Sequence, residues 1–171
     1  SYKGASDTDF IASVFYSYAT SLVIKAGKAL NKDVREYEEL YSKIVDKTRK
    51  TFTEYKTQTE CVIALYFDIA TDKAAVAKQL ADMIKSNGTK LTTGFVGTPY
   101  ILQALSENGH EDIAYSLLLQ EEYPSWLFSV NMGATTIWEH WDGMKADGSM
   151  WSDDMNSFNH YAYGAVASWL Y

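Results

Sequence analysis

The chain has 171 residues, a length that suits one domain, and its 47% hydrophobic and 22% charged residues are typical of a globular protein. Fifteen basic and 22 acidic side chains give a net charge of -7, which argues against a nucleic-acid or anionic-membrane surface. The single cysteine, Cys61, excludes an intrachain disulfide framework and a multi-cysteine zinc site. No uninterrupted run of 18 apolar residues exists, so the sequence predicts no membrane insertion.

Helical periodicity dominates the first half of the chain. Apolar residues recur there at steps of three and four, a spacing that places them on one face of a helix. The four stripes are Ile11, Phe15, Tyr18 and Leu22; Val34, Tyr37, Tyr41, Ile44 and Thr48; Cys61, Ala64, Leu65 and Ile69; and Val76, Leu80, Met83 and Ile84. Asp72 is the expected N-cap of the fourth helix, and Asn87-Gly88 is its expected end.

Further helices are predicted in the second half. Thr98-Pro99 suits a helix start, with the helix running to about Glu107. The others are expected from about 111 to 120, from Pro124 to near Gly133, and over 158–170, with 89–97, 134–141 and 142–156 non-helical. About eight helices joined by short turns predict an all-α fold of stacked αα-hairpins, forming a single domain over 1–171 with no internal boundary.

One segment, 134–143, concentrates the side chains that could carry chemistry. Glu139 lies between Trp138 and Trp141, beside His140 and Asp142. An indole has an apolar face and a polar tip, which suits the C–H patches and hydroxyls of a sugar, and glycoside hydrolysis uses carboxyl groups as acid and base. From composition alone, core tryptophans and a solvated Glu139 are the commoner outcome.

The remaining candidates are weaker. His160 could hydrogen-bond a ligand, although a structural histidine is the commoner interpretation. The glycines of segment 94–97 do not have the spacing of a nucleotide-binding motif. They favour a tight turn between helices. Cys61 lies on an apolar stripe and is expected to be inert. The histidines and the aspartates of 142–154 lack the spacing of a metal site, so we predict neither a metal nor a cofactor.

Four ordered motifs nevertheless resemble a known family. They are Leu91-Thr-Thr-Gly-Phe-Val-Gly-Thr-Pro-Tyr100, Tyr123-Pro-Ser-Trp126, Gly133-Ala-Thr-Thr-Ile-Trp-Glu-His-Trp-Asp142 and Ser157-Phe-Asn-His-Tyr-Ala-Tyr-Gly164. Their order is similar to that in bacterial α-L-rhamnosidases of glycoside hydrolase family 78, and the resemblance extends from about Asp9 to Tyr171.

This resemblance implies a fold, an activity and a site. The fold would be part of an (α/α)6 toroid of six hairpins. The activity would be hydrolysis of terminal α-L-rhamnose from a glycoside or polysaccharide, with inversion at the anomeric carbon. Glu139 would be the general base and His160 would contact the sugar, and Trp138 and Trp141 would shape the wall of the sugar pocket and exclude solvent.

The sequence departs from the family pattern in two respects. The acidic motif that carries the family's general acid is not found between Ser1 and Lys90, and about eight helices are fewer than twelve. We therefore expect a C-terminal portion of a catalytic domain that is inactive alone and self-associates through the exposed face of an incomplete toroid. Two alternatives stay open: a non-catalytic helical-repeat or glycan-binding module, and another (α/α)6 glycosidase or lyase.

Overall fold

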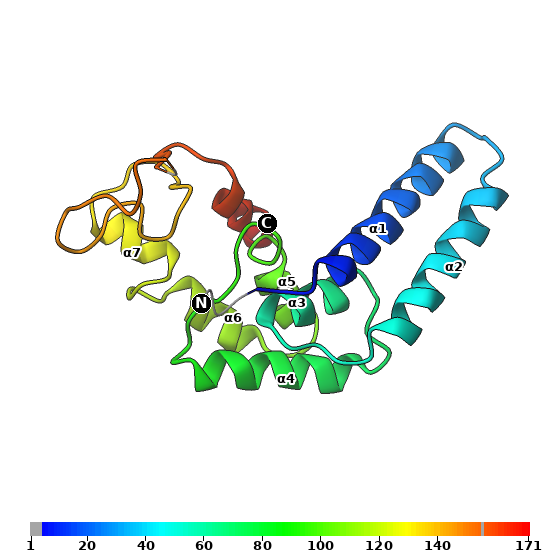
Figure 1. The fold of residues 1–171 in the computed structure, drawn as a ribbon, viewed down its shortest axis with the longest axis horizontal. Helices are drawn as coiled ribbons and strands as arrows, with labels where there is room; N and C mark the ends of the chain where they lie inside the picture. Colours follow the sequence, from blue (N-terminus) through cyan, green and yellow to red (C-terminus); the bar gives the residue numbers. More distant parts are fainter. Residues whose placement is uncertain (1–4, 155) are drawn as a thin grey trace.

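The computed structural model describes residues 5–154 and 156–171, and its regular elements are helices (Figure 1). Within those residues no strand forms, and one isolated antiparallel bridge joins Met144 to Met150. The all-α prediction is confirmed. The helices are α1 (Thr8–Ala29), α2 (Arg35–Thr51), α3 (Gln58–Tyr66), α4 (Lys73–Ser86), α5 (Ile101–Ser106), α6 (Glu111–Leu118), α7 (Trp126–Asn131) and the 3₁₀-helix η1 (Ala162–Leu170).

The first six helices form three αα-hairpins. Helix α1 packs on α2, α3 on α4, and α5 on α6, while α3 also contacts both α1 and α5. Helices α1, α3 and α5 therefore form a row, and each of them packs against the second helix of its own hairpin. Figure 1 shows the far ends of α1 and α2 projecting from this body, and α7 with its following loop forming a lobe at the opposite end.

Several predicted helix ends are confirmed. Asp72 caps α4 by accepting a hydrogen bond from the N–H of Ala75 at 3.0 Å. Gly88 and Gly109 follow α4 and α5 with φ of 71° and 78°, a conformation that glycine adopts without a steric penalty.

Three predicted boundaries are wrong. Helix α5 begins at Ile101, because the Thr98 hydroxyl is buried and bonds that of Thr93 at 2.9 Å instead of capping a helix. Helix α7 is capped by Ser125, whose hydroxyl accepts from the N–H of Phe128. The last helix is 3₁₀ and starts only at Ala162, because the preceding residues bond to another segment of the chain.

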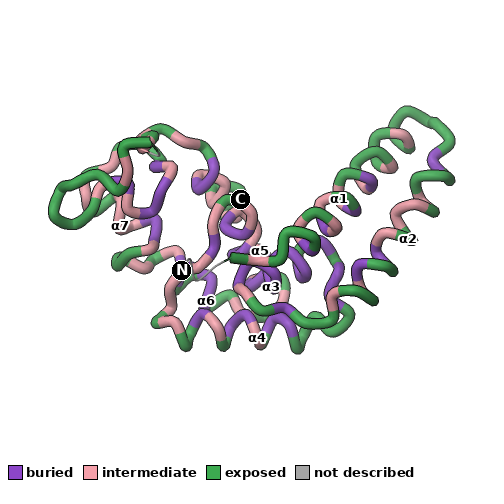
Figure 2. Tube along the Cα trace, in the orientation of Figure 1, coloured by how far each residue is buried: buried purple, intermediate pink, exposed green. Residues whose placement is uncertain are grey.

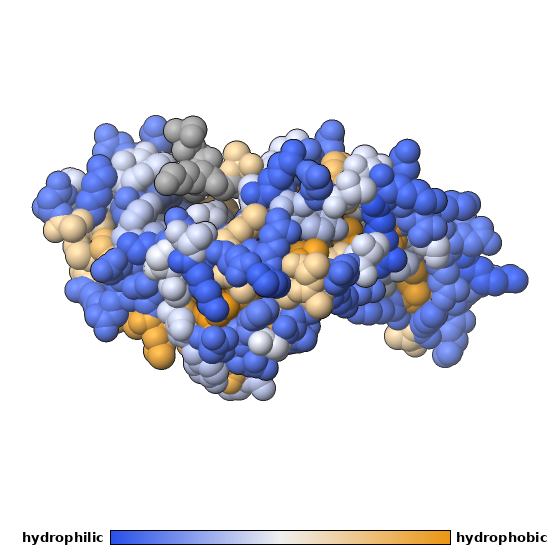
Figure 3. Space-filling model, turned by 90° about the horizontal axis from the view of Figure 1, so that it is seen from below, coloured by the Kyte–Doolittle hydropathy of each residue, from blue (hydrophilic) through white to orange (hydrophobic). Residues whose placement is uncertain are grey.

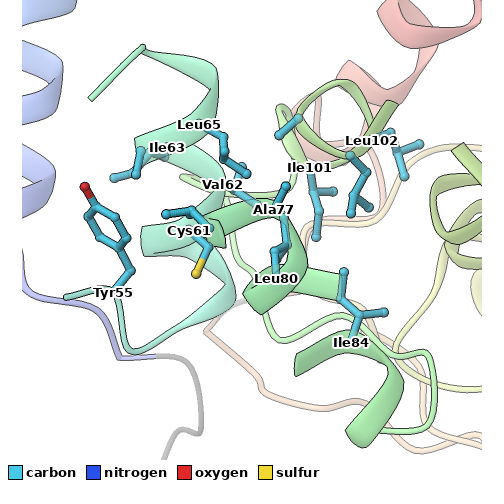
Figure 4. Packing of buried hydrophobic residues seen from close by; sticks show 14 of the residues in the cluster. Tyr55, Cys61, Val62, Ile63, Leu65, Ala77, Leu80, Ile84, Ile101 and Leu102 are labelled. Carbon is cyan, nitrogen blue, oxygen red and sulfur yellow. The ribbon is translucent and has the colours of Figure 1, made fainter. Parts of the chain in front are cut away.

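The core lies where the hairpins meet. Helix α3 is buried from Gln58 to Leu65, since α1, α4 and α5 enclose it (Figure 2). Figure 4 shows its side chains packed against those of α4 and α5. The fully buried members include Cys61, Val62, Ile63, Leu80, Ile84, Ile101 and Leu105. Burying a side chain of this size stabilises the fold by about 1.5–3 kcal/mol.

The buried face of α1 overlaps the predicted stripe only in part, with Ile11, Phe15 and Tyr18 packing against the core from partly buried positions. Phe10 and Val14 are the fully enclosed apolar residues, whereas Phe15 and Tyr18 are half-buried and Leu22 is 44% exposed. The shift arises because α1 lies between α2 and α3 at its start and reaches past α3 towards its end.

Two polar side chains, the buried Glu60 and the half-buried Arg49, fix the connections between the hairpins. The Glu60 carboxylate, 5% exposed, accepts hydrogen bonds from the N–H groups of Asp7 at 2.8 Å and Lys56 at 2.6 Å. This ties the start of α1 to α3. The Arg49 guanidinium donates to the carbonyls of Asp68 and Ile69 and so ties α2 to the turn after α3.

The surface is mostly hydrophilic but carries hydrophobic patches, as the face in Figure 3 shows. In the described part of the chain one helix, α1, is long and apolar enough to span a membrane by length and composition alone, a test that core helices also pass. It packs on α2 and α3, with Tyr16, Leu22 and Val23 exposed.

Candidate functional site

Glu139 lies on the non-helical segment 134–141, which follows α7. Segment 157–160 runs beside it and is bonded to it through the backbone. The N–H of Glu139 donates to the carbonyl of Ser157 at 2.9 Å, the N–H of His160 donates to the carbonyl of Ile137 at 2.8 Å, and the Thr136 hydroxyl donates to the carbonyl of Phe158. Two candidates that are 21 positions apart in sequence are thereby held on adjacent segments.

The Glu139 side chain is also held. Its Oε2 accepts a hydrogen bond from the N–H of Ser157 at 3.2 Å, and the residue is half-buried. The carboxylate is thus directed by the same segment that carries His160, while part of it remains open to a reactant. A held carboxylate of this kind can accept a proton from water.

Two aromatic rings stack near the His160 ring. Phe95 is nearly parallel to it with centroids 5.0 Å apart, and Tyr161 is nearly parallel at 5.2 Å. The N–H of Ala162 donates to Nδ1 at 3.3 Å, so in the neutral imidazole the proton belongs on Nε2. That nitrogen can donate a hydrogen bond to a hydroxyl group.

Trp138 and Trp141 are packing residues in this structure. They are 5% and 8% exposed, respectively. Trp138 meets Phe158 edge-on, and Trp141 lies flat on Tyr163 with centroids 3.9 Å apart and an interplanar angle of 7°. Other side chains of the protein enclose both indole rings. That Trp138 and Trp141 line a sugar pocket stays a prediction.

His140 and Asp142, which the sequence indicated only as neighbours of Glu139, are paired with each other. His140 Nδ1 and Asp142 Oδ1 are 2.5 Å apart, His140 is 7% exposed, and the Trp151 indole stacks on its ring at 3.8 Å. Trp151 follows a short hairpin in which Asp147 accepts hydrogen bonds from the N–H and hydroxyl of Ser149. The hydrogen bond from the Ser149 hydroxyl, and to a smaller extent that from the Ser149 N–H, hold the pKa of Asp147 below its ordinary value.

The four sequence motifs converge at this site. Phe95 of the first motif stacks on His160 of the fourth, and Trp126 of the second meets Trp141 of the third edge-on. Trp126 Nε1 donates to the carbonyl of Tyr163 at 2.9 Å. Ring stacking between motifs has no signal in a single sequence, so this convergence could be seen only in the structure.

The first motif has a glycine that its surroundings require. A side chain at Gly97 would bring a Cβ to 2.8 Å from Thr59 Oγ1 and 2.9 Å from Thr93 Cγ2. The predicted tight turn is confirmed, with the N–H of Thr98 donating to the carbonyl of Gly94 at 3.0 Å. Thr93 in turn accepts from Trp141 Nε1 through its carbonyl at 3.4 Å, which joins this turn to the Glu139 segment.

Other reactive groups lie away from this site. Burial, and secondarily the neighbouring Glu60, raise the pKa of Cys61 to about 12, so its thiol is neutral and enclosed. A hollow of about 430 Å³ is lined by residues of 49–56 and 69–79 and includes none of the candidate residues. Among residues 5–154 and 156–171, no group of three His, Cys, Asp or Glu side chains is arranged to hold a metal.

Comparison with known proteins relates this geometry to a family. The model of the bacterial alpha-L-rhamnosidase 6 hairpin glycosidase domain matches residues 1–171. The chain is 38% identical to an alpha-L-rhamnosidase of Streptomyces avermitilis and 36% identical to one of Formosa agariphila, with 95% and 99% of the chain covered. It covers 17% and 19% of those two proteins, less than a fifth of each.

Solved structures agree with the sequence relatives. The crystal structure of the Streptomyces avermitilis alpha-L-rhamnosidase complexed with L-rhamnose superposes with a TM-score of 0.92 at 35% identity, covering 99% of this chain and 18% of that one. The native enzyme of Aspergillus terreus gives 0.87 at 37% identity, covering 92% of this chain and 20% of that one. The predicted part of an (α/α)6 toroid is confirmed, and the chain belongs to the six-hairpin glycosidase family of bacterial α-L-rhamnosidases.

Proposed function

We propose that this chain is the C-terminal portion of the catalytic domain of an inverting α-L-rhamnosidase that removes terminal α-L-rhamnose from a glycoside or polysaccharide. Glu139 is its general base, and His160 binds a hydroxyl of the sugar. The observation that carries the proposal is the pairing of 136–139 with 157–160, which brings a half-buried carboxylate and an imidazole onto neighbouring segments. Relatives named alpha-L-rhamnosidase, and a similar structure complexed with L-rhamnose, support the choice of sugar.

The reaction follows from these two groups. Ionised Glu139 takes a proton from a water molecule while the water oxygen bonds to the anomeric carbon from the face opposite the leaving group. The bond between the anomeric carbon and the glycosidic oxygen breaks, and a carboxylic acid protonates that oxygen. In inverting enzymes the two carboxyl groups are roughly 6.5–9.5 Å apart, which leaves room for the water.

The partner acid is not assigned to a residue of this chain. We propose that it belongs to a part of the enzyme that the relatives have beyond the aligned fifth of their length. Asp142, the carboxylate three positions after Glu139 in the sequence, is bonded to His140. Contacts of Trp138 and Trp141 with the sugar, and self-association of the chain, stay predictions.

Replacement of Glu139 by Gln in the full-length enzyme tests the base assignment. Glutamine keeps the shape and the hydrogen bond from the Ser157 N–H but accepts no proton from water. Because a positioned base contributes about 10²–10⁴-fold to rate, we expect kcat on an aryl α-L-rhamnoside to fall by that factor. The KM should change much less, because glutamine preserves the packing of the site.

A matched control separates the base from a general loss of acidic charge. Glu122→Gln removes an exposed carboxylate that is paired with Lys90 at 2.8 Å, and it should leave kcat unchanged. Equal turnover by the Glu139→Gln enzyme and the wild type would exclude the base assignment. Binding of rhamnose without hydrolysis by the full-length wild-type protein would favour a glycan-binding module instead.

A further inference from the structure

The orientation of Glu139 depends on a loop. The chain leaves the site after Trp141, passes through a mostly exposed loop (Figure 2), and returns at Ser157. Ser157 then bonds Glu139 twice, with its carbonyl accepting from the Glu139 N–H and its N–H donating to Oε2. How the loop closes therefore decides where one oxygen of the carboxylate is held.

The first part of the loop is a small hairpin. The N–H of Lys145 donates to the carbonyl of Ser149 at 2.8 Å, and the N–H of Trp151 donates to the carbonyl of Gly143 at 3.2 Å. The bridge between Met144 and Met150 lies between these bonds. This hairpin returns the chain to its starting point and delivers the Trp151 indole beside His140.

The contact between Trp151 and His140 joins an exposed loop to a buried ring. The two rings are 3.8 Å apart and inclined by only 15°, and Trp151 is 38% exposed while His140 is 7% exposed. The bond from His140 Nδ1 to Asp142 Oδ1, 2.5 Å long, fixes the orientation of the imidazole on which the indole rests. His140 directly follows Glu139 in the chain. The residue on which the Trp151 indole rests is therefore the next residue after the proposed base.

We propose that His140, Asp142 and Trp151 are positioning residues for Glu139, and we term these three the His140 clamp. The inference rests on the proposed role of Glu139. Asp142 orients His140, the stack on His140 holds the hairpin closed, and the closed loop keeps the Ser157 N–H on Oε2 of the carboxylate. Without the stack, Ser157 would leave Oε2 for part of the time. A displacement of about 1 Å in a catalytic group can cost about 100-fold in rate.

The test is Trp151→Ala in the full-length enzyme, with kinetics and amide hydrogen exchange measured together. We expect kcat to fall by about 10- to 100-fold and KM to change by less than about threefold, because the clamp acts on the base and not on the sugar. Exchange of the Glu139 and Ser157 amides should become faster. Trp151→Phe keeps a flat ring on His140 and should restore most of kcat.

The matched control lies in the same hairpin. Lys145→Ala removes an exposed side chain but leaves the backbone bond to Ser149 and the stack, so neither kcat nor exchange should change. If the alanine variant of Trp151 does not fold, Asp142→Asn, which keeps the shape of the side chain but removes its charge, should still lower kcat and accelerate exchange at both amides.

The outcomes separate this inference from the proposed function. A large loss of kcat in Glu139→Gln together with normal kcat and normal exchange in Trp151→Ala would overturn the clamp and leave the base assignment standing. Normal turnover in Glu139→Gln would overturn the base assignment and, with it, the clamp as a positioning device. Slower turnover in Trp151→Ala that Trp151→Phe does not restore would also contradict the clamp.

Discussion

The hairpin body α1–α6 and the C-terminal lobe that follows it are held together by different interactions. In the body, apolar side chains of α3, α4 and α5 enclose one another, and Ile63, Leu80 and Ile101 are fully buried. In the C-terminal lobe, taken here as 134–171, the described residues form a single helix, the 3₁₀-helix η1, and ring stacks and single hydrogen bonds join its segments. The stack of Trp141 on Tyr163 is an example, and both rings also pack against the buried cluster of the body.

This difference separates stability from chemistry. Burial is not directional, so the body tolerates shifts in side-chain position that preserve volume. The proposed role of Glu139, in which its carboxylate meets a water and a sugar carbon, requires a fixed direction, and stacked rings and hydrogen bonds can supply it. Changes in the body should therefore lower stability, whereas changes in the lobe should lower turnover in a folded enzyme.

The largest expected effect is on stability, from Leu80→Ala in α4. Leu80 is fully buried, and truncation of such a leucine leaves a cavity that costs about 2–5 kcal/mol of the free energy of unfolding. Hydrogen exchange of α3 and α4 amides in the full-length protein measures the loss. The folded fraction should keep its kcat, and Leu80→Met should cost less than about 1.5 kcal/mol. A loss of kcat in fully folded Leu80→Ala protein would contradict the expectation that changes in the body affect stability and not turnover.

The second effect is on turnover, from Trp141→Ala in the lobe. Its ring lies on Tyr163 and meets Trp126, and its loss should displace the Glu139 segment. We expect kcat to fall about 100-fold, as for a catalytic group displaced by about 1 Å. Faster amide exchange should be confined to 134–171 and the adjoining 91–97 turn. Equal acceleration of exchange throughout α3 and α4 would contradict a lobe that is held separately from the body.

A third effect, Asp72→Ala, sharpens the contrast within the body. Asp72 caps α4 with one hydrogen bond to the N–H of Ala75, and loss of an N-cap typically costs about 1 kcal/mol. The melting temperature of the full-length protein should fall slightly while kcat stays constant. Asp72→Ser, which retains a capping oxygen, should behave as the wild type. A drop as large as that of Leu80→Ala would show that the cap does more than close a helix end.

The smallest effect is expected at Cys61. Burial raises its thiol pKa to about 12, whereas an exposed thiol has a pKa near 9. Between these values the folded state binds a proton that the unfolded state has lost, so the contribution of Cys61 to stability is complete below about pH 9 and is lost as the pH rises towards 12. At pH 8 the native protein should resist a thiol reagent, and Cys61→Ser should not alter kcat. Rapid labelling without unfolding would contradict the enclosed position.

Sequence periodicity predicted much of the body. Helical stripes and the Asp72 cap identified α2 and α4, because the apolar face of an amphipathic helix repeats locally. The start of α5 was missed because a tertiary contact decides it: Thr98 bonds Thr93. The stripe of α1 was predicted in part, but the full enclosure of Phe10 and Val14 was missed because it depends on where α2 and α3 cover α1.

The lobe was predicted less completely. Glu139 and His160 were selected through motif resemblance, and the structure holds them on adjacent segments. Burial of Trp138 and Trp141 agrees with the core interpretation that composition favoured. The stack of Trp151 on His140 could not be foreseen, because which ring meets which depends on how the loop closes and not on local spacing.

The most direct test of Glu139 as the base of an inverting enzyme is the product that azide forms with a Glu139→Ala variant. Azide is a nucleophile that needs no base, so added azide should restore turnover of an activated aryl α-L-rhamnoside. Attack from the face opposite the leaving group should yield β-L-rhamnosyl azide, which proton NMR identifies. Formation of the α-configured azide, or undiminished hydrolysis by the variant without azide, would contradict the account.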